Sequence, residues 1–155
     1  MRENRTYTYE IMFLVGQAQA ADFSGTIEHI RDLLGRAHAE ILAMKKWDER
    51  RLAYEIKKQK RGLYILAYVN APANSMRNFE RDCNLSEKIL RVLILRADHY
   101  TPEELVAHDA REALETEAKL RAKQAAERPA DTATATVTTA APVAAPAAVA
   151  EAEPE

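Results

Sequence analysis

The sequence lacks the residues on which several classes of protein depend. Cys83 is the one cysteine among 155 residues, so an internal disulfide and a zinc site built on paired cysteines are both excluded. No apolar run approaches the roughly 20 residues of a membrane span. The N-terminus, MRENRTYTYE, also lacks the apolar core of a signal peptide. We therefore expect a cytoplasmic protein that holds no metal and no other cofactor.

Catalytic motifs are missing as well. The four glycines form no phosphate-binding or dinucleotide-binding loop, and there is no H-E-x-x-H pattern and no nucleophile elbow. The four histidines, at 29, 38, 99 and 108, have no carboxylate, serine or third ligand at a recognisable spacing. The sequence therefore favours a binding or structural protein over an enzyme.

The net charge of −2 averages two unlike parts of the chain. Residues 1–101 hold 17 Lys and Arg against 13 Asp and Glu, a net of +4, whereas residues 102–155 hold 5 against 11, a net of −6. A basic body with an acidic C-terminal part fits a nucleic-acid partner better than the total charge does.

Composition also divides the chain into three parts. Residues 1–101 read as one folded domain. Residues 102–128 are helix-prone and charged, but Leu105, Leu114 and Leu120 are too sparse for an apolar stripe, so we expect a solvated helix outside the core. Residues 129–155 are almost wholly Ala, Thr, Pro, Val and Glu, which predicts a disordered tail.

Hydrophobic periodicity predicts six elements within residues 1–101. Alternating apolar residues predict strands over 6–15, 39–46 continuing past a bend or bulge at 47–49 into 50–58, 63–70 and 89–98, with a turn at 59–62. Apolar residues at helical spacing predict helices over 20–37 and from a cap at Asn74 or Ser75 to Cys83. The order β-α-β-β-α-β predicts an α+β ferredoxin-like sandwich, with a four-stranded antiparallel sheet and two helices on one face.

The most basic stretch runs from Lys45 to Arg61 and carries eight Lys and Arg in seventeen positions. Leu52, Tyr54 and Ile56 alternate with polar residues, which predicts a strand with one apolar and one charged face. Such a strand suits a surface that meets phosphate. A solvated edge strand, protected by its charges against pairing with other chains, is an equally good interpretation of this stretch alone.

Residues 61–68, which include the third predicted strand, partly resemble the third-strand signature of RNA-recognition motifs, because that signature begins with Lys or Arg followed by Gly, as at 61–62. The two positions that should stack on bases hold Leu63 and Ile65, however. Tyr64 and Tyr68 fall on the alternate face, where we expect the helices to pack. A base-stacking sheet is therefore disfavoured.

The same pattern predicts an apolar helix-free face that carries Leu63, Ile65 and Ala67. An open sheet face of this kind usually meets another protein. The alternative is that the C-terminal segment folds back over it.

The run W-x-x-R-R-L-A-Y-E-I at 47–56, followed by G-x-Y at 62–64, resembles the signature of the bacterial small-subunit ribosomal protein six family. Tyr9-Glu10 and the run at 89–96 resemble the opening and the last strand of that family, so the resemblance covers about residues 7–98. Two departures are about six extra N-terminal residues and Asp48 at a position where glycine commonly follows the tryptophan.

The resemblance implies a non-enzymatic constituent of the small ribosomal subunit. It implies binding to the central domain of 16S rRNA, in the platform, together with small-subunit ribosomal protein eighteen. Carried over by position, the candidates for rRNA contact are Arg50, Arg51, Lys57, Arg91 and Arg96. Tyr7 stands at the place of the family's N-terminal arginine, for which Arg5, or alternatively Arg2, is the candidate substitute. The expected protein-partner surface comprises Trp47, Leu63 and Ile65.

Two rival interpretations are kept. One is a ferredoxin-like regulatory or ligand-binding domain that forms a homodimer through its sheet. The other is an acylphosphatase-like hydrolase, which shares the predicted topology. It is disfavoured because the loop GQAQAA, which begins at Gly16, lacks the arginine of the acylphosphatase phosphate cradle.

Overall fold

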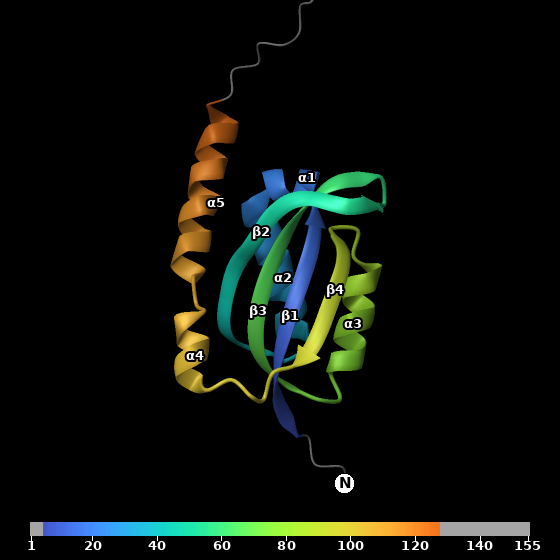
Figure 1. Ribbon diagram of the computed structural model, residues 1–155, viewed down its shortest axis with the longest axis vertical. Coiled ribbons are helices and arrows are strands. Elements are labelled where there is room, and N and C mark those ends of the chain that lie inside the picture. The colour runs from blue at the N-terminus through green and yellow to red at the C-terminus, as the bar shows by residue number, and fades with distance from the viewer. Residues whose placement is uncertain (1–4, 128–155) are drawn as a thin grey trace, which may run out of the picture.

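The computed structural model describes residues 5–127, which form a four-stranded antiparallel sheet with helices against it (Figure 1). In chain order the elements are β1 (Thr6–Gly16), α1 (Gln17–Ala21), α2 (Phe23–Arg36), β2 (Glu40–Ile56), β3 (Gln59–Pro72), α3 (Met76–Leu85), β4 (Ile89–Arg96), α4 (Pro102–Ala107) and α5 (Arg111–Ala126). The strand order in the sheet is β2-β3-β1-β4. The predicted ferredoxin-like fold is confirmed.

The main core lies between the sheet and the helices α2 and α3. Phe13 of β1 and Phe79 of α3 meet edge to face, with ring centroids 6.2 Å apart. Cys83 of α3 is fully buried, and burial raises the pKa of its thiol to about 12. It is therefore an unreactive core residue at neutral pH.

The predicted helix over 20–37 is two helices in the structure. Asp22 separates α1 from α2, and its side chain accepts a hydrogen bond from the amide of Gly25 at 3.2 Å, which caps the second helix. At the other end His38 adopts a left-handed φ of 54°. Its amide and that of Ala39 donate to carbonyls one turn back, which is the Schellman arrangement.

The faces of β3 are the reverse of the prediction. Leu63 and Ile65 are 0% exposed and pack in the main core beneath the helices. Tyr64 and Tyr68 lie on the opposite side, which we call the open face. Both faces of β3 are apolar because this strand is covered on both sides for most of its length, so alternation alone does not distinguish them.

The C-terminal segment is also more deeply packed than predicted. Leu105 of α4 and Leu114 of α5 are only 6% and 2% exposed. Leu105 packs on Leu66 and Tyr68, so α4 covers part of the open face, while α5 lies against α2 and β2 (Figure 1). The expectation of a helix outside the core is therefore wrong for these two leucines. The tail predicted over 129–155 lies outside the described residues.

The segment between α4 and α5 binds the free edge of β2. The amide of Met44 donates to the Asp109 carboxylate at 3.2 Å, and the Met44 carbonyl accepts from the amide of Ala110 at 3.1 Å. Arg111 adds a bond to the Leu42 carbonyl at 3.4 Å. Three successive outward-facing backbone groups of this edge strand are thus paired within the chain.

The strand β2 is continuous through the predicted bulge, and the shift of register between Lys46 and Asp48 confirms that bulge. The hairpin turn, however, lies at Lys57–Lys58 instead of 59–62, because Ile56 already pairs with Gln59. Another shift of register lies between Ile41 and Ala43, and a third follows Arg51. The third shift leaves residues 52–55 without a partner in the register, and the end of the hairpin bends across the sheet toward β4 (Figure 1).

Candidate nucleic-acid and partner interface

The bent end of the hairpin, residues 50–62, is called the hairpin arm, and it concentrates positive charge. Its basic residues are all exposed and lie in both strands and in the turn: Arg50, Arg51, Lys57, Lys58, Lys60 and Arg61. Glu55 is the one acidic residue in this range, and it pairs with Lys60 at 3.4 Å. The arm therefore carries a net positive charge of five.

Two features of the hairpin arm oppose its own stability. Arg51 and Arg61 stand directly opposite each other in the two strands, and like charges in that position destabilise a sheet. Lys57 and Lys58 both have positive φ, 46° and 64°, the sign required at the centre of a type I′ turn. Asn-Gly suits that turn, whereas lysine adopts positive φ only with strain. An anionic partner would relieve the repulsion between these cations, so the hairpin arm is suited to bind one.

Next to the arm, an exposed tryptophan is framed by polar neighbours. Trp47 is 48% exposed at the bulge of β2, and its ring meets Tyr64 edge to face at 5.6 Å. The guanidinium of Arg50 lies 5.8 Å from the Trp47 ring centroid, and an ion pair at 3.8 Å joins it to Asp48. The Trp47 ring thus offers an apolar surface beside a cation.

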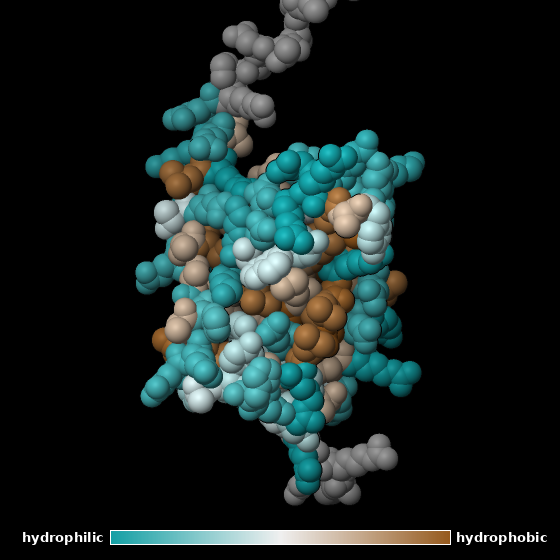
Figure 2. Space-filling view, viewed as in Figure 1, coloured by the Kyte–Doolittle hydropathy of each residue, from teal (hydrophilic) through white to brown (hydrophobic). Residues whose placement is uncertain are grey.

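Between the arm and the sheet lies a mostly apolar hollow of about 350 Å³. Figure 2 shows apolar surface over the middle of the sheet, bordered above by the polar surface of the hairpin end. The residues that line the hollow include Met12 and Leu14 of β1, Leu52 and Tyr54 of the arm, and Leu93 of β4. Leu93 and the neighbouring Leu95 are 53% and 49% exposed, so this part of the open face is not covered by α4.

The structure divides the predicted rRNA-binding residues among three places. Arg50, Arg51 and Lys57 lie together in the arm. Arg91 faces the hollow, and its Nη1 donates to the Tyr54 hydroxyl at 2.6 Å.

The other two candidates lie at the far end of the sheet. Arg96 follows Arg91 by five residues, so it points to the other face of β4. It lies over the Tyr7 ring at 3.9 Å and pairs with Asp98 at 2.5 Å. Arg5 precedes β1, and its carbonyl accepts a hydrogen bond from Ala73. These two arginines are not part of the arm surface.

The partner surface predicted from the sequence changes in the same way. Trp47 is exposed, as that role requires, but Leu63 and Ile65 are buried under the helices and cannot meet a partner in this fold. Leu93 and Leu95 take their place on the open face. Sequence reasoning also omitted Lys58, Lys60 and Arg61 from the basic set, although all three belong to the same basic run.

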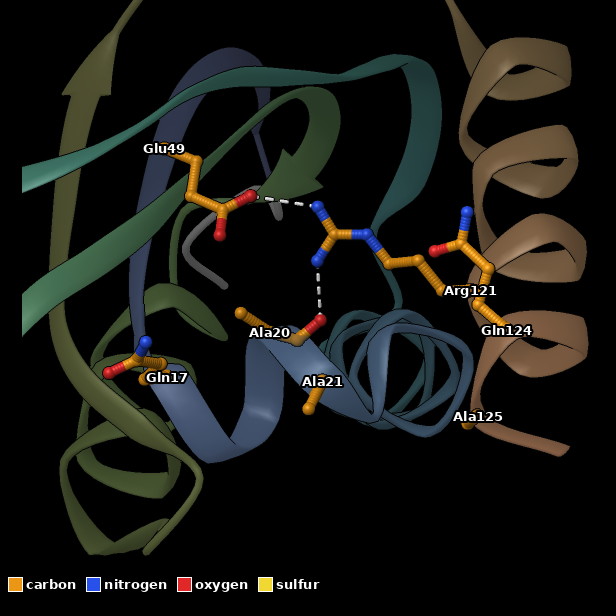
Figure 3. A pocket seen from close by; sticks show the side chains of 7 residues that line it. All are labelled: Gln17, Ala20, Ala21, Glu49, Arg121, Gln124 and Ala125. Atoms are coloured by element: carbon orange, nitrogen blue, oxygen red, sulfur yellow. Dashed lines mark hydrogen bonds and ion pairs between the residues drawn. The ribbon is translucent and has the colours of Figure 1, made fainter. Parts of the chain in front are cut away.

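A second cavity, of about 540 Å³, lies between α1, β2 and α5, and two of its lining residues, Glu49 and Arg121, belong to a neutral ion-pair network (Figure 3). Arg121 of α5 binds the Ala20 carbonyl at 2.5 Å and the Glu49 carboxylate at 2.7 Å, and Glu117 pairs with both Arg121 and Lys46 at 2.7 Å. The Arg121 hydrogen bond lowers the pKa of Glu49. Burial would raise the pKa of Glu117, but Lys46 and Arg121 bring it below its usual value.

Because the two cations of this network are matched by two carboxylates, the cavity offers no surplus charge to an anion. The network instead fixes α5 to the body of the protein. Within residues 5–127, no group of three His, Cys, Asp or Glu side chains is placed to hold a metal ion. No helix in that range has the length and apolarity needed to cross a membrane.

A ferredoxin-like sandwich with a self-repelling basic arm beside an apolar sheet face has the features of a binding protein. Comparisons of this chain with known proteins identify the family to which this binding protein belongs. The family model described as ribosomal protein S6 matches residues 8–96. The small ribosomal subunit protein bS6 of Campylobacter lari and that of Campylobacter jejuni are each 32% identical to this chain over 92 residues, 59% of this chain and 74% of the relative.

The crystal structure of 30S ribosomal protein S6 from Thermotoga maritima is similar in fold. Its TM-score is 0.56 at 22% identity, with 66% of this chain and 98% of that chain covered. The chain belongs to the ribosomal protein S6 family. It is accordingly a structural constituent of the small ribosomal subunit.

Proposed function

We propose that this protein binds the central domain of 16S rRNA together with small-subunit ribosomal protein eighteen, as part of the platform of the cytoplasmic ribosome. The hairpin arm meets rRNA phosphates, and the uncovered part of the open face meets the protein partner. The observation that carries the RNA assignment is the uncompensated charge of the arm, where Arg51 opposes Arg61 and Lys57–Lys58 form the turn.

Contact through lysine and arginine to phosphate positions a protein without reading bases. The deep major groove of paired RNA gives side chains little access to base edges, so recognition follows the shape of the folded rRNA. Each phosphate contact releases counterions, which makes the affinity fall with salt. The arm should therefore bind rRNA fragments of suitable shape with a strong and measurable salt dependence.

The protein partner requires a different kind of surface. Trp47, Leu93 and Leu95 are about half exposed, and together with the hollow they form an apolar area beside a charged rim. Exposed aromatic and aliphatic side chains surrounded by polar residues are typical of the centre of a protein–protein interface. Part of the open face is already occupied by α4, which confines the partner to the part that α4 leaves uncovered.

Fluorescence anisotropy with a 16S central-domain fragment tests the RNA assignment. We expect the charge-neutralising variant Lys58→Gln/Arg61→Gln to weaken binding at every salt concentration. It should also reduce the slope of log affinity against log salt by about 1.4–1.8. Arg77→Gln in the exposed face of α3 is the matched control and should leave the slope unchanged. An arm variant that binds as tightly as the native protein contradicts the proposal.

Co-sedimentation from cell extract tests the assembly. The protein should travel with small subunits or their precursors, and ribonuclease treatment should release it. Leu93→Asp should abolish binding to the purified protein partner while leaving the RNA affinity of the isolated protein intact. Sedimentation as a homodimer that Leu93→Asp disrupts would instead support a sheet-mediated dimer.

A further inference from the structure

The tip of the hairpin arm is only loosely fixed by backbone pairing. The base of the arm is paired, Arg51 with Arg61 and Gly62 with Gly16 of β1, but residues 52–55 on the β2 side have no cross-strand partner in the register. The Gln59 side chain accepts a hydrogen bond from the amide of Gln17 at 3.4 Å, and three further contacts hold the arm over the open face. Leu52 is 8% exposed and, like Leu14, packs closely against Gly62. A Cβ atom at position 62 would clash with Leu14 and crowd Leu52. Lys57 donates a weak bond to the Ile89 carbonyl at 3.5 Å.

The third contact is the most specific. The guanidinium of Arg91, on β4, donates to the Tyr54 hydroxyl at 2.6 Å and lies 5.4 Å from the centroid of the Tyr54 ring. Tyr54 belongs to the unpaired segment of the arm, and Arg91 belongs to the sheet. The pair therefore joins the arm to a strand at the opposite side of the sheet from β2.

We propose that Arg91 is a positioning residue, which holds the hairpin arm through Tyr54 so that the arm's lysines and arginines are presented to RNA in one arrangement. This inference rests on the proposed function of the arm. It changes the role of Arg91, which the sequence alone makes a phosphate contact. An arm that is already held in place loses less conformational entropy on binding RNA than a mobile arm does. The smaller entropy loss raises the affinity for RNA.

The contact can be weakened without changing any charge of the arm. Tyr54→Leu removes the hydroxyl and the ring but keeps an apolar side chain over the hollow. We expect it to weaken binding of the central-domain rRNA fragment about three- to tenfold. This is only part of the free energy that an exposed cation–π contact and a hydrogen bond to a charged group supply together, because the other contacts of the arm remain. The salt slope should stay unchanged, because no phosphate contact is lost.

A second pair of the same chemistry provides the control. Tyr7 and Arg96 also form a ring–guanidinium contact and also involve β4, but they lie at the other end of the sheet. Tyr7→Leu should leave both the affinity and the slope at their native values. Lys57→Gln, which removes an arm charge, should lower the slope by about 0.7–0.9.

Two further measurements separate positioning from direct contact. If Arg91 acts through Tyr54, Arg91→Gln and Tyr54→Leu should be non-additive in a double-mutant cycle, whereas independent contacts of both residues with RNA would add. Hydrogen exchange of the free protein should show faster exchange of the amides of the paired residues Ile56 and Gln59 in either variant, with the main core unchanged. Thermal unfolding should show that both variants remain folded.

The outcomes of these experiments test the positioning role of Arg91 separately from RNA binding by the hairpin arm. Native affinity in Tyr54→Leu, with a salt slope lowered by Arg91→Gln, would show that Arg91 contacts phosphate itself and would overturn the positioning role alone. Additive effects or unchanged exchange in the arm would do the same. Failure of the native protein to bind the fragment, or of Lys57→Gln to alter binding, would overturn the proposed RNA-binding function first.

Discussion

Replacing the Lys57–Lys58 turn by Asn-Gly should stabilise the protein and weaken its RNA binding in one step. Both lysines have positive φ, 46° and 64°, and are the central residues between the paired Ile56 and Gln59. A left-handed conformation costs an ordinary L-residue roughly 1–2 kcal/mol, whereas Asn-Gly is the preferred pair for a turn of this type. The full cost for two residues would be twice that figure, but small adjustments of the native turn relieve part of the strain. We therefore expect Lys57→Asn/Lys58→Gly to raise the free energy of unfolding by about 1–2 kcal/mol.

Two assays measure the two effects. Urea unfolding reports the gain in stability, which corresponds to a rise in Tm of roughly 4–10 °C for a domain of this size. Fluorescence anisotropy at several salt concentrations reports the loss of two phosphate contacts as a slope lowered by about 1.4–1.8. The control Lys57→Gln/Lys58→Gln removes the same charges but keeps the unfavourable turn, so it should weaken RNA binding without the gain in stability.

Each half of this reasoning can fail separately. A less stable Asn-Gly variant would mean that the turn is not strained in the way its φ angles indicate. Undiminished RNA affinity would mean that the two lysines do not contact phosphate. The combination of higher stability and weaker binding is what distinguishes a turn selected for function from one selected for folding.

Three further predictions concern how α5 is held. Arg121→Ala should lower the free energy of unfolding by about 1–3 kcal/mol in urea titrations, because Glu49 and Glu117 lose a charged donor. The lowered pKa values of these carboxylates stabilise the fold above their unfolded pKa, near 4.5, so stability should fall as pH drops below that value, and less steeply in Arg121→Ala. Leu114→Ala should cost about 2–4 kcal/mol by thermal unfolding, whereas Leu120→Ala, at a half-exposed site, should cost under about 0.5.

The parts of the fold that the sequence predicts well are those where polarity differs between faces. The helices and the edge strand β2 show such a difference, and the acidic pair Asp48–Glu49 indicates the bend or bulge beside Trp47. The strand β3 has apolar residues on both faces, so its orientation depends on what covers each face. That information resides partly in α4, which is why Leu63 and Ile65 were assigned to the wrong side.

The turn and the C-terminal helices show two other reasons for error. Lys57–Lys58 carries no Gly, Asn or Pro, the residues by which turns are recognised, so the sequence favours 59–62 with its glycine. In α5, Leu114 packs in the main core as a single deeply buried side chain. A pattern search that requires apolar residues to recur at helical spacing cannot detect a single buried residue. Of the candidate site, the basic run was predictable from composition, while the separation of Arg91 from Arg96 required the register of β4.

The closure of the β2 edge by Asp109, Ala110 and Arg111 has a consequence for the order in which the protein folds during synthesis. Asp109 is 65 residues beyond Met44, the residue whose backbone it binds. Domains generally fold as the chain emerges from the N-terminus, so the sheet can form before residues 109–111 have left the ribosome. During that interval the edge of β2 is open to pairing with another chain, and Lys45 and Lys46 are the charges that protect it. The nascent protein is therefore most prone to association just before residues 109–111 emerge and bind this edge.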